Sequence, residues 1–173
     1  MWRRACLRLF GLAAAGLVAA TPAFAADAAS EQSMRAVLVY NFIKFTEWPT
    51  AAGDPQLRVC IASGDPAQIA ALEALDERRV RGKPLEAVRF RRQADCDVIY
   101  VDSRQRWKEI AAQPAAGHIL TVGGYVGFVA DGGMIEIALQ ESGARFDINL
   151  QEAKRAGLRF YPQLLRLARR IVE

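Results

Sequence analysis

The sequence MRAVLVYNFIKFTEWP occupies residues 34–49 and predicts the helix on which the fold is built. Its large, mostly apolar side chains recur three or four residues apart, which places them along one side of a helix. This stripe consists of Met34, Val37, Leu38, Asn41, Phe42, Phe45 and Trp48. Pro49 is expected to end the helix, because proline disfavours helical geometry in the residue before it. Three aromatic rings on one stripe give the helix a large apolar area to bury.

The residues before this helix have the pattern of a secretory signal peptide. Arg3 and Arg4 form a basic start, residues 9–20 are apolar or glycine, and Ala23-Phe24-Ala25 has the small-x-small pattern of a cleavage site. The apolar run is too short for a membrane anchor, since spanning a bilayer takes about 20 residues. We therefore expect cleavage after Ala25. Residues 26–173 would then form a single exported domain in the periplasm, starting with a polar lead at residues 26–31.

Removal of the signal peptide changes the charge balance. The chain has 23 basic and 19 acidic residues; without Arg3, Arg4 and Arg8, 20 face 19, a net charge of +1. This near-neutral charge gives no reason to expect a nucleic-acid partner. One local excess remains, opposed only by Glu86: Arg78, Arg79, Arg81, Lys83, Arg89, Arg91 and Arg92. A solvated turn and strand edge is the favoured interpretation, and contact with an acidic partner or anionic lipid is the alternative.

Strands alternate with helices over residues 57–122. Apolar runs at residues 57–62, 97–101 and 118–122 predict buried strands, and residues 85–91 alternate like a half-exposed strand. A helix is expected after Asp65-Pro66 and another after Asp102-Ser103. This order predicts an α/β fold, a single-domain layered sandwich with a mainly parallel sheet and helices on both faces.

The last third of the sequence has a different pattern. Residues 134–139 and 144–150 alternate and predict an antiparallel hairpin at the sheet edge. A short helix over residues 151–156 would follow, with Gly157 at its C′ position. Pro162 starts the last predicted helix, whose apolar stripe is Leu164, Leu165, Ala168 and Ile171.

No group of residues predicts catalysis, a cofactor site or a metal site. Residues 123–127 (GGYVG) follow a strand, but they lack both G-x-G-x-x-G spacing and a following helix, so a flexible bend is favoured over nucleotide binding. His118 is the only histidine and is expected to be structural. Glu136, Arg145 and Asp147 are expected to form a satisfied polar network on the hairpin surface. We expect a binding protein, not an enzyme.

Cleavage would remove Cys6 and leave Cys60 and Cys96. Two thiols in an oxidising compartment favour one disulfide. The alternative is that both are small buried residues in strands that lie too far apart to join.

Several segments together resemble the YfiR family of periplasmic proteins, from about Val39 to Arg169. They are YNFIKFTEWP, LRVCIAS, CDVIYV, ILTV, GGMIEI, RFDINLQEAKRAGL and LLRLAR, in that order. The resemblance implies an α/β fold without enzymatic activity, dimeric in several members. It also implies repression of an inner-membrane diguanylate cyclase of the YfiN type through the periplasmic region of that cyclase. An OmpA-like outer-membrane lipoprotein of the YfiB type would withdraw the repressor and raise cyclic di-GMP.

The resemblance also concerns single residues. Cys60 and Cys96 match positions that pair in the family. A second cysteine pair, present later in some members, has no counterpart here, and Phe160-Tyr161-Pro162 stands where members usually have serines. The alternative function from another class is a periplasmic small-molecule sensor or solute-binding module. Its pocket would lie at the carboxyl ends of the parallel strands, near Ser63-Gly64 and Asp102-Ser103.

Overall fold

The computed structural model describes residues 23–49, 55–114, 117–140 and 143–173. The predicted signal peptide lies outside these residues except for its last three positions, the cleavage motif ending at Ala25. Within the described ranges, no helix combines the length and apolar content that crossing a bilayer requires.

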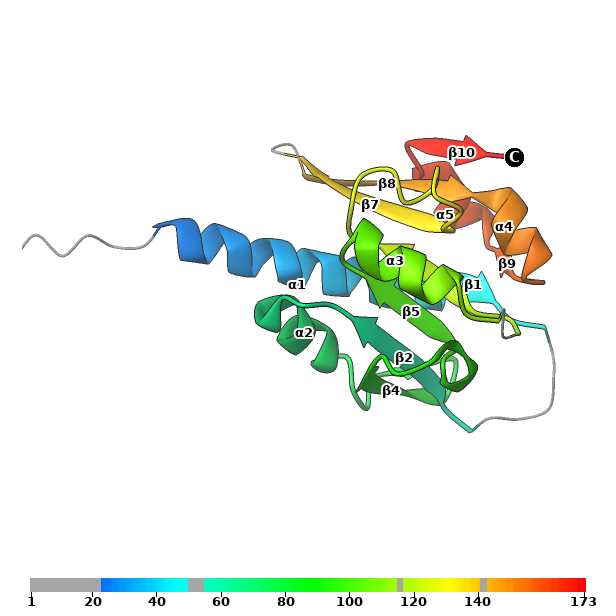
Figure 1. Ribbon diagram of the computed structural model, residues 1–173, viewed down its shortest axis with the longest axis horizontal. Coiled ribbons are helices and arrows are strands. Elements are labelled where there is room, and N and C mark those ends of the chain that lie inside the picture. The colour runs from blue at the N-terminus through cyan, green and yellow to red at the C-terminus, as the bar shows by residue number, and fades with distance from the viewer. Residues whose placement is uncertain (1–22, 50–54, 115–116, 141–142) are drawn as a thin grey trace, which may run out of the picture.

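One eight-stranded sheet organises the molecule (Figure 1). Its strands are, in spatial order, β10 (Arg170–Val172), β8 (Gly143–Asn149), β7 (Ile135–Gln140), β6 (Leu120–Gly123), β5 (Val98–Val101), β2 (Leu57–Ala62), β4 (Lys83–Arg89) and β3 (Arg79–Val80). The run from β7 to β4 is parallel, whereas β7–β8 and β3–β4 are antiparallel hairpins. The predicted α/β class with a mainly parallel sheet and an antiparallel C-terminal hairpin is confirmed.

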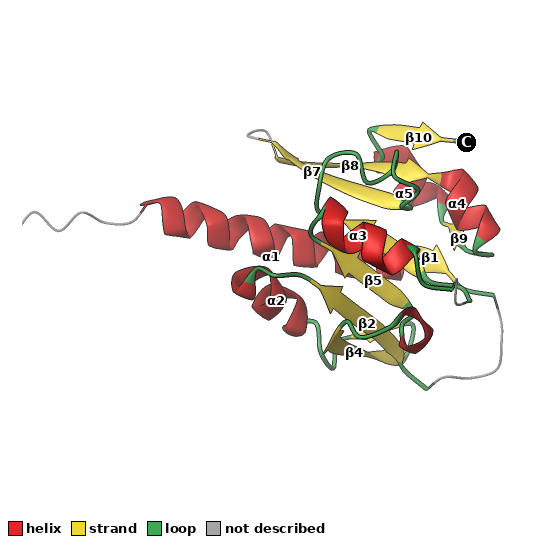
Figure 2. Cartoon of the chain, viewed as in Figure 1, coloured by secondary structure: helices red, strands yellow, loops and turns green. Residues whose placement is uncertain are grey.

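Helices cover both faces of this sheet, as predicted (Figure 2). One face packs against α1 (Ala23–Lys44), α2 (Pro66–Glu73), α4 (Leu150–Arg155) and α5 (Pro162–Leu167), which share the larger core cluster. The other face packs against α3 (Arg104–Ala111), whose Trp107 and Ile110 belong to a smaller cluster with Phe128 and Cys60. A short 3₁₀ helix, η1 (Gln93–Asp95), precedes β5.

The bounds of α1 differ from the prediction at both ends. The helix begins at Ala23, so the expected lead at residues 26–31 is helical. It ends at Lys44, several residues before Pro49. The cause is a second, two-stranded sheet, in which β1 (Thr46–Glu47) pairs with β9 (Arg159–Phe160). The Thr46 hydroxyl also donates to the carbonyl of Phe42 at 2.7 Å, which satisfies a group of the last helical turn.

The buried face of α1 coincides only in part with the predicted stripe, of which Phe42 is buried and Leu38, Phe45 and Trp48 pack against the core. Ala36, Val39, Phe42 and Ile43 are buried, whereas Met34 and Val37 are 40% and 57% exposed. Apolar residues lie on both sides of this helix, so three- and four-residue spacings select either face. The stripe of large side chains from Met34 to Trp48 therefore includes residues that remain accessible to solvent.

The predicted position of the C-terminal hairpin at the sheet edge is wrong, and so is the extent of the last helix. Helix α5 ends at Leu167, where Ala168 turns to an extended conformation (ψ 138°). The chain then forms β10, parallel to β8, with Ile171 beside Ile148. Strand β8 is therefore an inner strand, and β10 forms the edge.

Candidate functional site

The Phe128 ring and the Glu136 carboxylate pack against the backbone of the glycine-rich loop at residues 123–133. A Cβ placed on Gly123 or Gly133 would lie 2.1 Å from a ring atom of Phe128. Glu136 is 3% exposed, and its carboxylate accepts hydrogen bonds from the backbone N–H groups of Gly127 and Val129 at 3.1 and 3.2 Å. A phosphate cradled by this loop would need free backbone donors of this kind. The loop is therefore a packed bend, and two of its donors already have an anion of the protein as partner.

Residues of helix α3 form hydrogen bonds to Asp131 of this loop. Arg104 and the Tyr125 hydroxyl both donate to one oxygen of Asp131, at 2.7 and 3.0 Å, and the Trp107 indole donates to its backbone carbonyl at 2.9 Å. Desolvation works against the charged carboxylate, but hydrogen bonds from Arg104 and Tyr125 outweigh it and lower the pKa of Asp131. Asp131 therefore stays an anion that serves packing.

His118 is structural, as predicted. Its Nδ1 lies 2.6 Å from the carbonyl of Ala156, at the end of α4. A carbonyl accepts only, so Nδ1 must carry the proton and donate. The backbone oxygen of His118 in turn accepts from the Trp48 indole at 2.9 Å. In the described part of the chain, no set of three or more His, Cys, Asp or Glu residues is arranged to hold a metal ion.

The hairpin has a satisfied polar network, but its members differ from the prediction and its carboxylates are buried, not on the surface as predicted. Glu136 and Asp147 are cross-strand neighbours, and both are buried. Arg145 is exposed and takes no part. Asp147 instead pairs with Arg169 and Arg170 from the chain after α5. Sequence reasoning missed Arg169 and Arg170 because the last helix was expected to continue through them.

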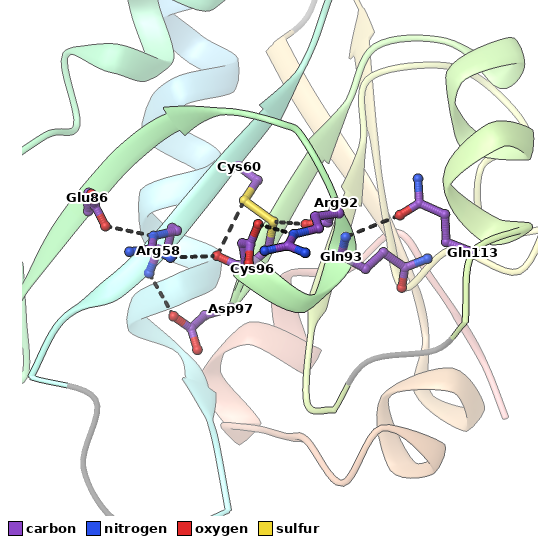
Figure 3. Close-up of a disulfide and its surroundings, with 9 residues drawn as sticks. Arg58, Cys60, Glu86, Arg92, Gln93, Cys96, Asp97 and Gln113 are labelled. Carbon is purple, nitrogen blue, oxygen red and sulfur yellow. Dashed lines mark hydrogen bonds and ion pairs between the residues drawn. A yellow bond between two sulfur atoms is a disulfide. The ribbon is translucent and has the colours of Figure 1, made fainter.

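Cys60 and Cys96 are joined in a disulfide, with their Cα atoms 5.8 Å apart (Figure 3). The bond connects β2 to the segment just after η1. Backbone bonding supports the junction: the N–H of Arg58 donates to the Asp97 carboxylate at 2.7 Å, and the N–H of Asp97 donates to the Arg58 carbonyl at 3.0 Å. The N–H of Gln93 donates to the side chain of Gln113 at 3.2 Å, which connects η1 to the end of α3. Of the two alternatives, the structure has the bonded pair.

The seven cations of residues 78–92 fall into two groups. Arg89 and Arg92 pair with Glu73 and Asp95 at 3.0 and 2.8 Å. The other five have no carboxylate partner among the described residues: Arg78, Arg79, Arg81, Lys83 and Arg91. Arg79, Arg81 and Lys83 lie on the β3–β4 hairpin and Arg78 lies directly before it; we group these four as the hairpin cations. The turn residues Arg81 and Gly82 both have positive φ. The sequence therefore located the excess of basic residues correctly, but only the structure shows which of them have a carboxylate partner and which do not.

Tyrosine rings hold this hairpin against α1 and the residue before α5. The guanidinium of Arg78 lies 5.6 Å from the ring centre of Tyr40, whose hydroxyl donates to the Arg79 carbonyl at 3.1 Å. Arg81 lies 5.7 Å from the ring centre of Tyr161 and donates to the Thr46 carbonyl. Tyr161 therefore helps to position the hairpin.

The hairpin and α1 together form a surface that is both cationic and apolar. Val37 and Lys44 lie three and four residues from Tyr40, so all three share one side of the helix. We call the surface formed by Val37, Tyr40, Lys44, Arg78, Arg79, Arg81 and Lys83 the α1–hairpin surface. It combines cations that have no carboxylate partner among the described residues with the exposed Val37. Such a mixture is suited to contact with an acidic macromolecular surface.

The predicted pocket region at the strand ends is built around Asp102. One oxygen of this carboxylate accepts from the Ser63 hydroxyl at 2.9 Å and from the N–H of Gly64 at 2.7 Å. Its other oxygen lies 3.2 Å from Nε of Arg106. The structure thus brings Ser63-Gly64 and Asp102 together, as expected for the ends of neighbouring parallel strands. A cavity of about 410 Å³ opens beside them, lined by Ser63 and Arg106 among others.

Comparison with known proteins places this geometry in a family. No curated protein matches the chain significantly. A crystal structure of a conserved domain protein from Vibrio cholerae O1 biovar El Tor strain N16961 is similar, with 12% identity and a TM-score of 0.49. The match covers 81% of this chain but only 60% of the Vibrio chain, and it carries no argument about function. The YfiR/HmsC-like family model matches residues 32–169, which include nearly all of the described sheet, and the chain belongs to this family.

Proposed function

We propose that this protein is a periplasmic regulatory binding protein that represses an inner-membrane diguanylate cyclase and so lowers cyclic di-GMP signalling. The YfiR/HmsC-like family is in general periplasmic and regulatory, not catalytic. Repression of a cyclase, through the periplasmic region of that enzyme, is the specific step proposed for this chain. The α1–hairpin surface is the observation that supports docking of this protein to the cyclase.

This surface supports docking to an acidic partner. Lys44 and the four hairpin cations have no carboxylate partner among the described residues, so their charge is available to a second molecule. Complementary charge speeds association and suppresses wrong partners. Val37 lies on this surface, and Met34, three residues away, is also exposed. Both offer apolar area for the dry centre of a contact.

Repression requires a difference in affinity between two states of the cyclase. A ligand that binds both states equally shifts no equilibrium, however tightly it binds. We therefore propose that the α1–hairpin surface fits the inactive state of the periplasmic region better than the active state. An OmpA-like outer-membrane lipoprotein is the proposed antagonist, which withdraws the repressor. A homodimer is proposed as the form that meets the two halves of a dimeric cyclase.

The test uses purified protein and inner-membrane diguanylate cyclases from the same organism, each reconstituted in lipid nanodiscs. The readout is the rate of cyclic di-GMP synthesis as protein is added. For one cyclase we expect saturable inhibition that weakens at high salt, because screening reduces attraction between exposed charges. The variant Arg78→Glu/Lys83→Glu should weaken inhibition at least tenfold. The matched control is Arg145→Glu, an exposed arginine on β8 far along the sheet, which should inhibit like the wild type.

Two results would overturn the proposal. One is that no cyclase of the organism is bound or inhibited by wild-type protein. The other is inhibition that the double reversal leaves unchanged, which would remove the α1–hairpin surface from the mechanism. Circular dichroism and thermal unfolding of both variants establish that any loss of inhibition is not a loss of fold.

A further inference from the structure

We propose that the protein also binds a small organic anion in a cavity at the carboxyl ends of β2 and β4. The cavity measures about 410 Å³ and lies between these strand ends and α3. We call it the arginine cavity; its main lining residues are Ser63, Arg89, Phe90, Arg91, Arg106 and Ile110. Open α/β sheets bind ligands outside the carboxyl ends of their parallel strands, and small-molecule sites span about 300–1,000 Å³. This site does not depend on the proposed cyclase.

Three guanidinium groups line the arginine cavity and retain unused donors. Arg106 pairs with Asp102 through Nε, and Arg89 donates to Glu73 through Nε. Arg91 makes no hydrogen bond or ion pair with any described residue. A guanidinium carries its N–H donors in a planar fork that matches a carboxylate or a phosphate. The cavity therefore offers several charge-assisted hydrogen bonds to one anionic group.

Contacts within the protein position Arg106. Asp102, which pairs with it, is itself fixed by the Ser63 hydroxyl and the N–H of Gly64. Arg106 also crosses Gly64 so closely that a Cβ there would lie 2.6 Å from Nη2. A side chain that is ordered before binding loses less conformational freedom on binding.

Part of the cavity lining is apolar and is called its floor below. Phe90 and Ile110 both line the cavity; Ile110 is buried in the smaller core cluster, and the half-buried Phe90 packs against that cluster. An inorganic ion would not use such a floor, whereas an organic anion covers it with its hydrocarbon part. The combination of a guanidinium rim and an apolar floor therefore assigns the ligand class: a small molecule with one carboxylate or phosphate group and an apolar body.

A larger hollow nearby does not have this character. It measures about 590 Å³ and also includes Arg89 and Arg91. However, four carboxylates line it: Glu73, Asp76, Glu86 and Asp95. Its Arg58 already donates to Glu86 at 2.7 Å. The arginine cavity has one carboxylate in its lining, Glu109, which accepts from Gln105 at 2.9 Å. An anion therefore meets less repulsion in the arginine cavity.

The test is a titration of the purified, isotope-labelled protein followed by amide chemical shifts. The probes are benzoate, its neutral isostere benzamide, and inorganic phosphate. We expect benzoate to give saturable shifts centred on Gly64, Phe90 and Ile110. Benzamide should give none, and phosphate should bind more weakly than benzoate. Arg91→Gln should raise the Kd for benzoate at least about tenfold, because a charge-assisted hydrogen bond is lost from a residue with no structural partner. Arg145→Gln should leave the Kd unchanged.

Several outcomes would overturn the inference. They are no saturable shift with benzoate, equal shifts with benzamide, tighter binding of phosphate than of benzoate, or an unchanged Kd in an Arg91→Gln/Arg106→Gln double variant. Benzoate shifts confined to the α1–hairpin surface would count against the cavity in the same way. None of these readouts involves a cyclase, so failure here and failure of the proposed repression are separable.

Discussion

Arg169 holds Asp147 in a two-pronged ion pair, with Nε–Oδ1 and Nη2–Oδ2 distances of 2.8 and 2.9 Å. Asp147 is only 1% exposed, and Nε of Arg170 donates to it as well, at 3.1 Å. The N–H of Arg169 also donates to the carbonyl of Phe146 at 2.8 Å. The Asp147 carboxylate on β8 therefore binds the chain after α5, where this chain forms β10 beside β8.

Asp147→Asn should destabilise the fold and loosen its C-terminal strand. The amide retains the shape of the side chain but loses the charge that orients two guanidinium groups. We expect a loss of about 1–3 kcal/mol in the free energy of unfolding, limited by the partial exposure of Arg169. Urea denaturation followed by tryptophan fluorescence measures it. Arg145→Gln on the same strand is the control, and equal effects of the two variants would refute a special role for the ion pair.

The same pair makes stability depend on pH. Hydrogen bonding to Arg169 is the main cause that lowers the pKa of Asp147 below its ordinary value. A lowered native pKa means that the stabilisation is fully present above the unfolded pKa of about 3.9 and disappears as pH falls through the native value. The stability gap between wild type and Asp147→Asn should thus be constant from pH 7 to about 5 and close below about 4. Denaturation curves across this range test it; a gap that persists in acid would contradict the cause.

Val39 and Val37 give a matched test of the observed face of α1. Val39 is 0% exposed and Val37 is 57% exposed, two positions apart on one helix. Val39→Ala should cost about 1–3 kcal/mol, since it removes buried methyl groups and leaves a cavity. Val37→Ala should change stability by less than about 0.5 kcal/mol, because alanine is also the better helix former. Chemical denaturation of both variants decides; the reverse order would restore the face that the sequence suggested.

Features encoded by neighbouring residues could be predicted from the sequence. Asp65 caps α2 by accepting from the N–H of Ala67 at 2.9 Å, with Pro66 in the first turn, as the motif indicates. Gly157 has a φ of +70° at the end of α4, which glycine adopts without strain. The order of strands and helices followed from apolar runs and these caps, because each signal lies within a few residues of its effect.

Features that depend on distant residues could not be predicted. The end of α5 depends on Asp147, some twenty residues earlier in the chain, and the apolar stripe gave no sign of it. The buried face of α1 depends on which side meets the sheet, and both sides carry valine. The cationic excess was visible in the sequence, but Glu73 and Asp95 neutralise two of its members only through tertiary contacts. The charge of the α1–hairpin surface thus comes from the cations that have no carboxylate partner among the described residues.

In Gly123→Ala, the added methyl group should collide with the Phe128 ring, whereas the backbone conformation of residue 123 should accept alanine. The added Cβ would lie 2.1 Å from the ring, which fills the bend of the loop. We expect a loss of about 1–3 kcal/mol from overpacking. In a Phe128→Leu background the same substitution should cost much less, with a coupling energy of at least about 1 kcal/mol in the double-mutant cycle. Additive effects would show that the ring does not enforce glycine at this position.

The disulfide should stabilise the fold mainly by restricting the unfolded chain. Cys60 and Cys96 are 36 residues apart, and a loop of this size corresponds to about 4 kcal/mol in the chain-entropy model. We expect Cys60→Ala/Cys96→Ala to lose roughly that amount. Its denaturant m-value should rise, because the unfolded state becomes more extended.

Urea denaturation with and without reductant separates the effect of losing the disulfide from other effects of the two substitutions. Reductant should destabilise the wild type towards the double variant and leave the double variant itself unchanged. Two titratable thiols in the unreduced, denatured wild type would contradict the bond, and an unchanged unfolding midpoint in the double variant would contradict its stabilising role.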